Sequence, residues 1–383
     1  MTRRLAILTE IIAPYRIPVF NALAARSDVD LHVIFLSEND PSLRQWHVYK
    51  NEIRFSYEVL PAWRRRLGRY NLLLNWGVSS ALRRARPDAL LCGGYSYMAA
   101  WQSAFWAKRH RVPLLLWSES TALDLRRSHG IVEFIKRRFR MRCQAFVAAG
   151  RASRDYLIAL GATDGTIFIA PDAVDVEFFA AAAAKARQQE REIRVRHNLP
   201  PRYFLCVGRL IKEKGVFELL EAYAKLEAPV RSRMGLVFVG DGTARDELAQ
   251  RAAEIRPGVV RFCGWVHREQ IPEIYALAEA LVFPTYSDPW GLVVNEAMAC
   301  RLPIIASQVA GCVPDLLQDG WNGFAVRPRD VDALEGAMQA LLNNAESGTQ
   351  MGSHSFLRVQ GYTPETCAAG IAQALAFAAG ELS

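Results

Sequence analysis

The segment from residue 284 to residue 307 reads PTYSDPWGLVVNEAMACRLPIIAS. It follows the apolar run Ala280–Pro284 and carries the turn-forming sequence Ser-Asp-Pro at 287–289. The residues from Gly291 onward favour a helix, and Pro303 opens a second apolar run. A strand, a turn, a helix and a strand in this order indicate one unit of a parallel sheet, so the segment predicts an α/β protein.

Short apolar runs alternate with helix-length segments along the rest of the chain as well. One series predicts strands at Leu5–Leu8, Leu31–Leu36, Ala89–Cys92, Leu114–Trp117, Ala145–Ala148 and Ile167–Ala170, and the other at Tyr203–Val207, Gly235–Val239, Val259–Cys263, Ala280–Pro284 and Pro303–Ala306. Continuous apolar strands separated by helices are typical of parallel sheets that are buried on both faces. The two series predict two Rossmann-like domains, joined by a helical connector at 180–198 that ends at Pro200.

The chain has 383 residues and a formal charge of +8, but this charge is divided unevenly. Residues 1–170 carry a net charge of +13 and the remaining residues a net charge of −5, which indicates different partners for the two halves. A hydrophobic content of 51% excludes a disordered or fibrous protein. The longest apolar runs are strand-sized, so no membrane span is predicted. The seven cysteines form no CxxC pair, so we expect a reducing cytosol and no metal site.

The start of the helix after Gly291 is a candidate anion site. The free amides of Gly291, Leu292 and Val293 would point toward a phosphate, and the positive end of the helix dipole would strengthen its binding. Asp288 precedes the helix and Glu296 lies about one turn inside it, so both carboxylates could accept hydrogen bonds from sugar hydroxyls. The alternative interpretations are a helix N-cap for Asp288 and a solvated carboxylate for Glu296.

Three further loops follow predicted strands at the same edge of this sheet. Gly208 and Arg209 come after Tyr203–Val207 with Lys214 close by, and two cations beside a helix start suit a diphosphate, although solvated surface cations are an equal alternative. Gly240 ends another strand and is most simply a tight turn. Trp265 and Val266 follow a third strand, where a flat base could lie or where a packed Trp could end the strand.

These motifs together resemble the retaining glycosyltransferases of family 4, also called group 1, which have the GT-B fold. The matching sequences, in order, are Val207–Leu210 with Lys214-Gly215, Val239–Gly242, residues 284–307 and Asp319–Phe324. The resemblance implies two Rossmann-like domains that face each other across a cleft, with a C-terminal helix crossing back to the N-terminal domain. We expect an acceptor-binding domain at 1–180, a donor-binding domain at 200–355 and the returning helix at 356–383.

The resemblance also implies roles for individual residues. Arg209 and Lys214 would hold the diphosphate of the donor, Glu296 would bind its ribose, and Asp288 would contact its sugar. Asp288 stands where the family usually has Glu, and is one methylene shorter. Glu119 follows the strand after which the family often has a His, so it is a candidate for the catalytic face, with a loop or N-cap carboxylate as an equal alternative.

The remaining candidates lie on the acceptor side. Pro14, Tyr15 and Arg16 follow the first strand in a loop that lacks the glycines of a nucleotide-binding turn, so this loop would contact an acceptor or simply join a strand to a helix. His129 could reach the same region or lie on the surface.

The basic N-terminal half also suggests a partner. Arginines at 64–66, 69, 83, 84 and 86 flank apolar residues at 72–74, and the segment 131–143 places Ile131, Ile135 and Phe139 on one helical face among five cations. Basic amphipathic helices of this kind suit an anionic membrane surface, and a core-packed stripe with a solvated basic face is the alternative. We find no nucleic-acid-binding module and expect no nucleic acid.

These observations lead to one functional hypothesis. The chain is expected to move a sugar from a nucleotide-diphosphate sugar to a glycan or lipid-linked acceptor in cell-envelope polysaccharide, lipopolysaccharide or glycolipid synthesis. The sugar would keep its anomeric configuration, and neither a metal nor another cofactor would be needed. We expect a cytoplasmic protein, at most peripheral on the inner membrane face. The alternatives are a nucleotide-sugar epimerase or phosphorylase of the same architecture, or a non-catalytic basic protein that binds membranes.

Overall fold

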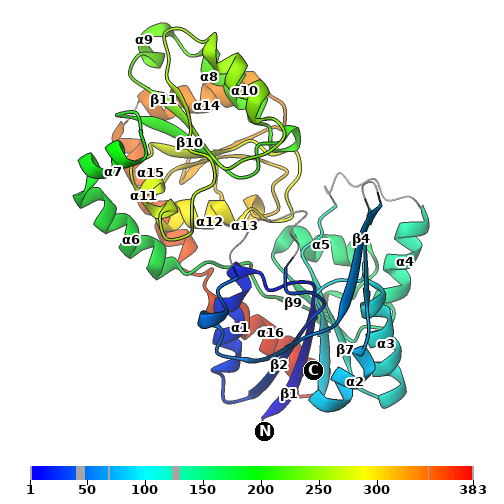
Figure 1. Ribbon diagram of the computed structural model, residues 1–383. Coiled ribbons are helices and arrows are strands. Elements are labelled where there is room, and N and C mark those ends of the chain that lie inside the picture. The colour runs from blue at the N-terminus through cyan, green and yellow to red at the C-terminus, as the bar shows by residue number, and fades with distance from the viewer. Residues whose placement is uncertain (1, 40–47, 68–69, 123–129, 344, 382–383) are drawn as a thin grey trace. The chain divides into compact units, whose positions relative to one another are not determined.

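A computed structural model describes residues 2–39, 48–67, 70–122, 130–343 and 345–381 of the chain (Figure 1). The chain forms two compact units. The N-terminal unit draws on Met1–Ala122, Arg126–Ala173 and Thr363–Ser383, and the C-terminal unit on Val174–Tyr362. The chain therefore passes between the units before the predicted connector, and the connector's helix α6 (Val176–Gln188) belongs to the C-terminal unit.

The N-terminal unit is built on a seven-stranded sheet with the strand order β3-β2-β1-β6-β7-β8-β9, in which every pairing is parallel. Its strands are β1 (Arg3–Thr9), β2 (Val29–Phe35), β3 (Ser56–Val59), β6 (Ala89–Cys92), β7 (Leu114–Ser118), β8 (Ala145–Ala148) and β9 (Ile167–Ile169). Its helices are α1 (Ile17–Ala24), α2 (Val78–Ala85), α3 (Met98–His110), α4 (Gly130–Arg140), α5 (Arg151–Ala159) and α16 (Pro364–Ala378).

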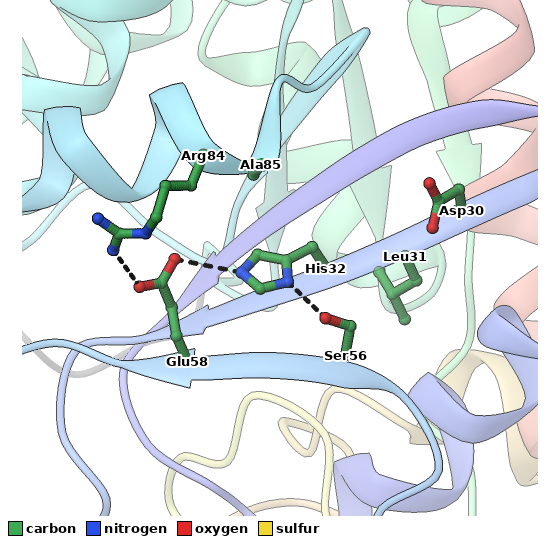
Figure 2. Close-up of a pocket in the computed structure, with 7 residues that line it drawn as sticks. All are labelled: Asp30, Leu31, His32, Ser56, Glu58, Arg84 and Ala85. Atoms are coloured by element: carbon green, nitrogen blue, oxygen red, sulfur yellow. Dashed lines mark hydrogen bonds and ion pairs between the residues drawn. The ribbon is translucent and has the colours of Figure 1, made fainter.

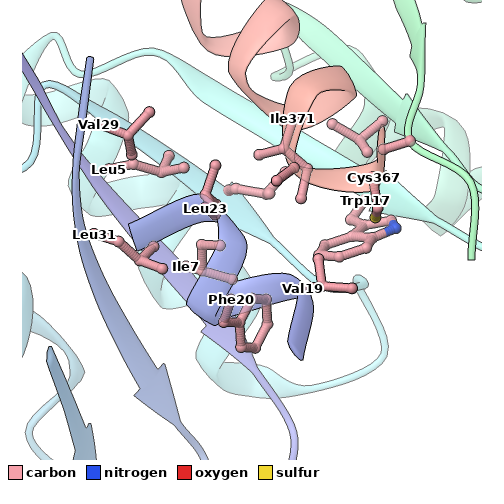
Figure 3. Packing of buried hydrophobic residues seen from close by; sticks show 14 of the residues in the cluster. Leu5, Ile7, Val19, Phe20, Leu23, Val29, Leu31, Trp117, Cys367 and Ile371 are labelled. Carbon is pink, nitrogen blue, oxygen red and sulfur yellow. The ribbon is translucent and has the colours of Figure 1, made fainter. Parts of the chain in front are cut away.

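Helices cover both faces of this sheet, as the continuous apolar strands predict. On one face, Leu5 and Ile7 of β1 pack with Phe20 of α1 and Ile371 of α16 in a buried cluster (Figure 3). Residues of α2, α3, α4 and α5 fill the other face. The last helix of the chain, α16, thus packs inside the N-terminal unit, where Gly370 lies so close to the backbone of β9 that a Cβ would overlap the carbonyl oxygen of Ile169.

The C-terminal unit is built on a six-stranded parallel sheet with the order β12-β11-β10-β13-β14-β15. Its strands are β10 (Tyr203–Val207), β11 (Gly235–Val239), β12 (Val260–Phe262), β13 (Ala280–Phe283), β14 (Ile304–Ser307) and β15 (Gly323–Val326). Besides α6, its helices are α7 (Glu190–Arg196), α8 (Val216–Lys225), α9 (Ala228–Arg231), α10 (Arg245–Ala253), α11 (Ile271–Ala276), α12 (Leu292–Ala299), α13 (Val313–Leu316), α14 (Val331–Asn343) and α15 (Ala345–Val359). The prediction of an α/β protein with two Rossmann-like domains is confirmed.

Residues 62–75 of the first basic segment form a β-hairpin, so the prediction of a basic helix is wrong there, whereas Arg83 and Arg84 of the same segment lie in the helix α2. Strand β4 (Ala62–Leu67) pairs antiparallel with β5 (Tyr70–Asn75), which places Arg64 opposite Leu73 and Trp63 opposite Leu74. The alternation of side chains has the period of a strand: Leu73 is buried, while Trp63 and Leu72 on the other face are exposed. The second basic segment does form a helix, α4. None of the helices in the described parts of the chain is long and apolar enough to cross a membrane.

Candidate functional site

Two glycines bring adjacent strands of the C-terminal unit together at their carboxyl ends. Gly208 follows β10 with a φ of +141°, and its amide donates to the carbonyl of Val239 at 2.9 Å. Gly240 follows β11 with a φ of +124°, and a Cβ on it would overlap the carbonyl oxygen of Gly208. Glycine is thus required at 240 for the two loops to pack together, and the backbone at this edge stays open to a ligand.

Lys214 and Asp288 form an ion pair at the same edge. Lys214 ends a short 3-10 turn after β10, and the following Gly215 has a φ of +67° and lies against the carbonyl of Pro284, so the turn is fixed to the end of β13. The Lys214 ammonium donates to Oδ2 of Asp288, and both side chains are less than one-fifth exposed. The backbone amide of Trp290 donates to Oδ1 of Asp288 at 3.1 Å. Asp288 is therefore held by Lys214 and a local turn.

The helix α12 begins where the sequence predicts it. Its N-cap is Gly291, whose φ of +102° suits glycine, and a Cβ there would lie 2.7 Å from the ring of Phe283. No side chain caps this end of the helix, so Asp288 is not its N-cap. The amides of the first turn, which include Leu292 and Val293, are therefore left for an anion, close in sequence to the Lys214–Asp288 pair.

Glu296, one turn into α12, is partly buried rather than a solvated surface carboxylate. The hydroxyl of Tyr275 in α11 donates to its Oε2 at 2.8 Å. Removal from water raises the pKa of Glu296 from 4.5 to about 7, while the hydrogen bond from Tyr275 and the positive charge of Arg268 act in the opposite direction. This carboxylate can accept a further hydrogen bond from a ligand hydroxyl, and it changes charge near neutral pH.

The other predicted donor residues are open to solvent. Arg209 follows Gly208 with an exposed side chain, and it makes no ion pair with any residue that the structure describes. Trp265 is 49% exposed after β12 and Val266 is half-buried. All of these residues follow carboxyl ends of neighbouring strands, so the sheet order places them along one edge.

The predicted acceptor residues lie at the carboxyl edge of the N-terminal sheet. Pro14, Tyr15 and Arg16 form a 3-10 turn after β1. The Arg16 guanidinium donates to the carboxylate of Glu119, and it lies 3.9 Å from the ring centre of Trp117. The carboxylate of Glu119 is thus paired with a cation. His129 lies outside the described residues.

A cavity of about 390 Å³ lies elsewhere in the N-terminal unit, between β2, β3 and α2 (Figure 2). His32 contacts Ser56 through Nδ1 at 2.8 Å and Glu58 through Nε2 at 3.2 Å, and Arg84 pairs with the second oxygen of Glu58 at 2.5 Å. The ring nitrogens of His32 and the carboxylate of Glu58 therefore already have hydrogen-bond or ion-pair partners within this cavity. We find no substrate site in this arrangement.

Sequence reasoning missed two residues of the site. Tyr275 and Arg268 both act on Glu296, yet they precede β13 in a stretch that matches no motif. Only the pattern of apolar residues at 271–276 could have indicated that Tyr275 points inward.

Comparison with known proteins agrees with this geometry. The family described as "Glycosyl transferases group 1" matches residues 188–357, and "Glycosyltransferase Family 4" matches residues 20–178. Over 180 residues, the chain is 34% identical to the alpha-D-kanosaminyltransferase of Streptomyces kanamyceticus, an alignment that covers 46% of this chain and 45% of the relative. It is 33% identical over 134 residues to the O-antigen chain mannosyltransferase B of Escherichia coli, covering 34% of each chain. The chain thus spans about half or less of the length of these curated relatives.

The fold has solved counterparts. HepE of Anabaena, solved in complex with UDP-glucose, matches with a TM-score of 0.75 and 19% identity over 98% of this chain and 100% of that one. At this identity the likeness concerns the fold alone. The two family matches cover separate parts of the chain, one mainly in each unit, and the match over residues 188–357 contains every motif at the carboxyl edge of the C-terminal sheet. The chain belongs to the group 1 glycosyltransferases of family 4, and its architecture is that of the GT-B glycosyltransferases.

Proposed function

We propose that the chain transfers a sugar from a nucleotide-diphosphate sugar to a glycan or lipid-linked acceptor, with retention of the anomeric configuration. The observation that carries this proposal is the grouping of Lys214, Asp288 and the uncapped start of α12 at one sheet edge. A cation and free amides suit a diphosphate, while carboxylates suit sugar and ribose hydroxyls. The likeness in fold to a protein that holds UDP-glucose supports a uridine nucleotide as the first donor to test.

The cations and the carboxylate of the site have different roles in this reaction. As the bond from sugar to diphosphate breaks, negative charge grows on the leaving group, and Arg209, Lys214 and the amides of α12 stabilise that charge. Asp288 keeps lone pairs free for a sugar hydroxyl because Lys214 and one amide occupy only part of its carboxylate. No carboxylate of the site is assigned as a covalent nucleophile, so we favour substitution from the front face, without a metal.

The N-terminal unit would bind the acceptor. Arg16 lies at the carboxyl edge of its sheet, held by Glu119 and stacked near Trp117, and it could receive a polar or phosphorylated acceptor group. Glu119 would then act by orienting Arg16. A relative that builds the O-antigen chain supports a role in cell-envelope polysaccharide, lipopolysaccharide or glycolipid synthesis at the inner membrane face. The basic hairpin and α4 support a peripheral membrane contact through this unit.

Thermal denaturation with uridine, guanosine and adenosine diphosphates tests the donor site. We expect one nucleotide to raise the melting temperature of the full chain and to have no such effect on Lys214→Met. The released nucleoside diphosphate is then measured with the matching nucleotide sugar. A transferase releases it in proportion to added acceptor, whereas an epimerase converts the donor without one. A non-catalytic membrane protein would respond to none of the nucleotides.

A further inference from the structure

A second group of cations lies in the N-terminal unit, where α3 packs against the end of α4. Trp101 of α3 contacts Phe139 of α4, with ring centres 5.1 Å apart. Beside this contact lies a cavity of about 490 Å³, whose polar and flexible lining residues are Lys108, Arg111, Arg138, Met141, Arg142 and Gln144. Among the residues that the structure describes, no Asp or Glu lines this cavity. The four cations that line it therefore share one hollow without a compensating carboxylate.

One of these four cations is held by neighbouring groups, and the other three are exposed. Lys108, Arg111 and Arg138 are exposed, and none of them forms an ion pair within the part of the chain that the structure describes. Arg142 is fixed in place, since it donates to the carbonyl of Arg138 at 2.8 Å and lies 5.3 Å from the ring centre of Trp101. The guanidinium groups have the fork geometry that binds phosphate oxygens. The cavity thus offers one fixed guanidinium and three exposed cations to an anion of phosphate type.

Large exposed apolar side chains lie on, or directly after, the two helices that border this cavity, and one of them, Met141, lines it. Phe105 is 71% exposed and lies one turn before Lys108 on α3. Phe134, Arg138 and Met141 follow each other at i, i+4 and i+7, so they share one face of the helix, and Phe134 and Met141 are 67% and 65% exposed. A water-soluble anion would gain nothing from these residues. At a bilayer surface, however, they could enter the boundary between headgroups and acyl chains.

We infer that this cavity binds the phosphate of an anionic membrane phospholipid, with Phe105, Phe134 and Met141 inserted around the headgroup. The inference deepens the proposed membrane contact of this unit and rests on it. The cavity lies where Pro113 precedes β7 and Gln144 precedes β8, at the amino ends of these strands, whereas Glu119 follows the carboxyl end of β7. The site is therefore separate from the acceptor residues and acts as a tether.

Two double variants with the same change in charge test the inference. Arg111→Gln with Arg138→Gln removes two cations from the cavity, and Arg109→Gln with Arg137→Gln removes two exposed cations from the same two helices that do not line it. Each protein is sedimented with vesicles of phosphatidylcholine alone or mixed with phosphatidylglycerol. If the protein is attracted to the membrane only by its overall positive charge, each lost cation weakens binding about fivefold, and the two pairs of substitutions have equal effects. We expect the cavity pair to bind the mixed vesicles at least about tenfold more weakly than the control pair.

The outcomes separate this inference from the proposed function. Equal losses for the two pairs, or equal binding of the wild type to neutral vesicles, overturn the cavity as a lipid site. If inorganic phosphate raises the melting temperature of the wild type but the protein does not prefer anionic vesicles, the cavity binds free phosphate and the assignment to a lipid is overturned. The nucleotide-induced thermal shift serves as the internal reference: the cavity pair should keep it. If the wild type lacks that shift, the donor assignment fails while the comparison of the two pairs remains valid.

Discussion

The hydroxyl of Tyr275 donates a hydrogen bond to the carboxylate of Glu296 at 2.8 Å, and the tyrosine is fully buried in α11. This hydrogen bond stabilises the ionised form of Glu296, whereas burial favours the protonated form. The pKa of Glu296 is raised from 4.5 to about 7, because the loss of solvation outweighs the help of Tyr275 and Arg268. The charge of the predicted ribose-binding residue therefore changes near neutral pH.

The raised pKa of Glu296 predicts how stability depends on pH. The folded protein binds this proton more tightly than the unfolded chain, so the free energy of unfolding falls as pH rises from about 4.5 to about 7 and levels off above. Glu296→Gln cannot titrate. We expect it to exceed the wild type in stability above pH 7, by on the order of 3 kcal/mol, and to differ little below pH 4.5. Urea unfolding of both proteins across this window measures the difference.

Tyr275→Phe provides the control. It removes the donor that stabilises the ionised form, so the fall in stability should extend to higher pH than in the wild type. A difference between the wild type and Glu296→Gln that does not change with pH would contradict the assignment of the raised pKa.

Lys214 and Lys212 lie in the same 3-10 turn but have different surroundings. Lys214 is partly buried and paired with Asp288, while Lys212 is exposed. Lys214→Met removes a charge-assisted contact to the diphosphate and leaves Asp288 without its cation, so we expect nucleoside diphosphate binding to weaken at least about tenfold. Lys212→Met should bind nearly as the wild type does. Titration calorimetry compares them, and equal losses would remove Lys214 from the site.

Arg209 is expected to act on the transition state. Its exposed guanidinium follows β10 at the edge where the leaving diphosphate would lie. Arg209→Ala should lower kcat by on the order of 10²-fold, the scale for losing one donor to developing charge. Arg233→Ala is the matched control, since Arg233 is also exposed but precedes β11 at the opposite end of the sheet. Turnover measured at saturating donor distinguishes them, and near-normal kcat in Arg209→Ala would reject the assignment.

Local signals made the turns at the carboxyl edge of the C-terminal sheet predictable. The turn at 287–289 and Gly291 define where α12 begins, and the structure starts that helix at Leu292. The glycines at 208 and 240 have the backbone conformations that their place after a strand suggests. Contacts between distant segments could not be predicted in the same way. The partners Arg16 and Glu119 are 103 residues apart, and only the order of β1, β6 and β7 in the sheet brings them together.

The hairpin of β4 and β5 shows why the expectation of a basic helix at residues 62–75 was wrong. The positive charge and the run of three leucines at 72–74 suggest a helical face, but these residues pair as strands. Leu73 is buried while Leu72 is exposed, which is the period of two that a strand imposes. Three consecutive leucines hide this alternation, because every position of the run is apolar whichever face it occupies.

The close approach of Gly240 to Gly208 gives the last prediction. Both φ values are positive, and a Cβ at 240 would overlap the carbonyl oxygen of Gly208, so Gly240→Ala must separate the ends of β10 and β11. We expect a loss of stability on the order of 2 kcal/mol or more, together with loss of the nucleotide-induced thermal shift. Gly336→Ala is the control, since it lies inside α14 with open space at its Cβ and should raise stability by about 0.5–1 kcal/mol. Denaturant unfolding measures both, and a Gly240→Ala protein as stable as Gly336→Ala would show that the loops can move apart without cost.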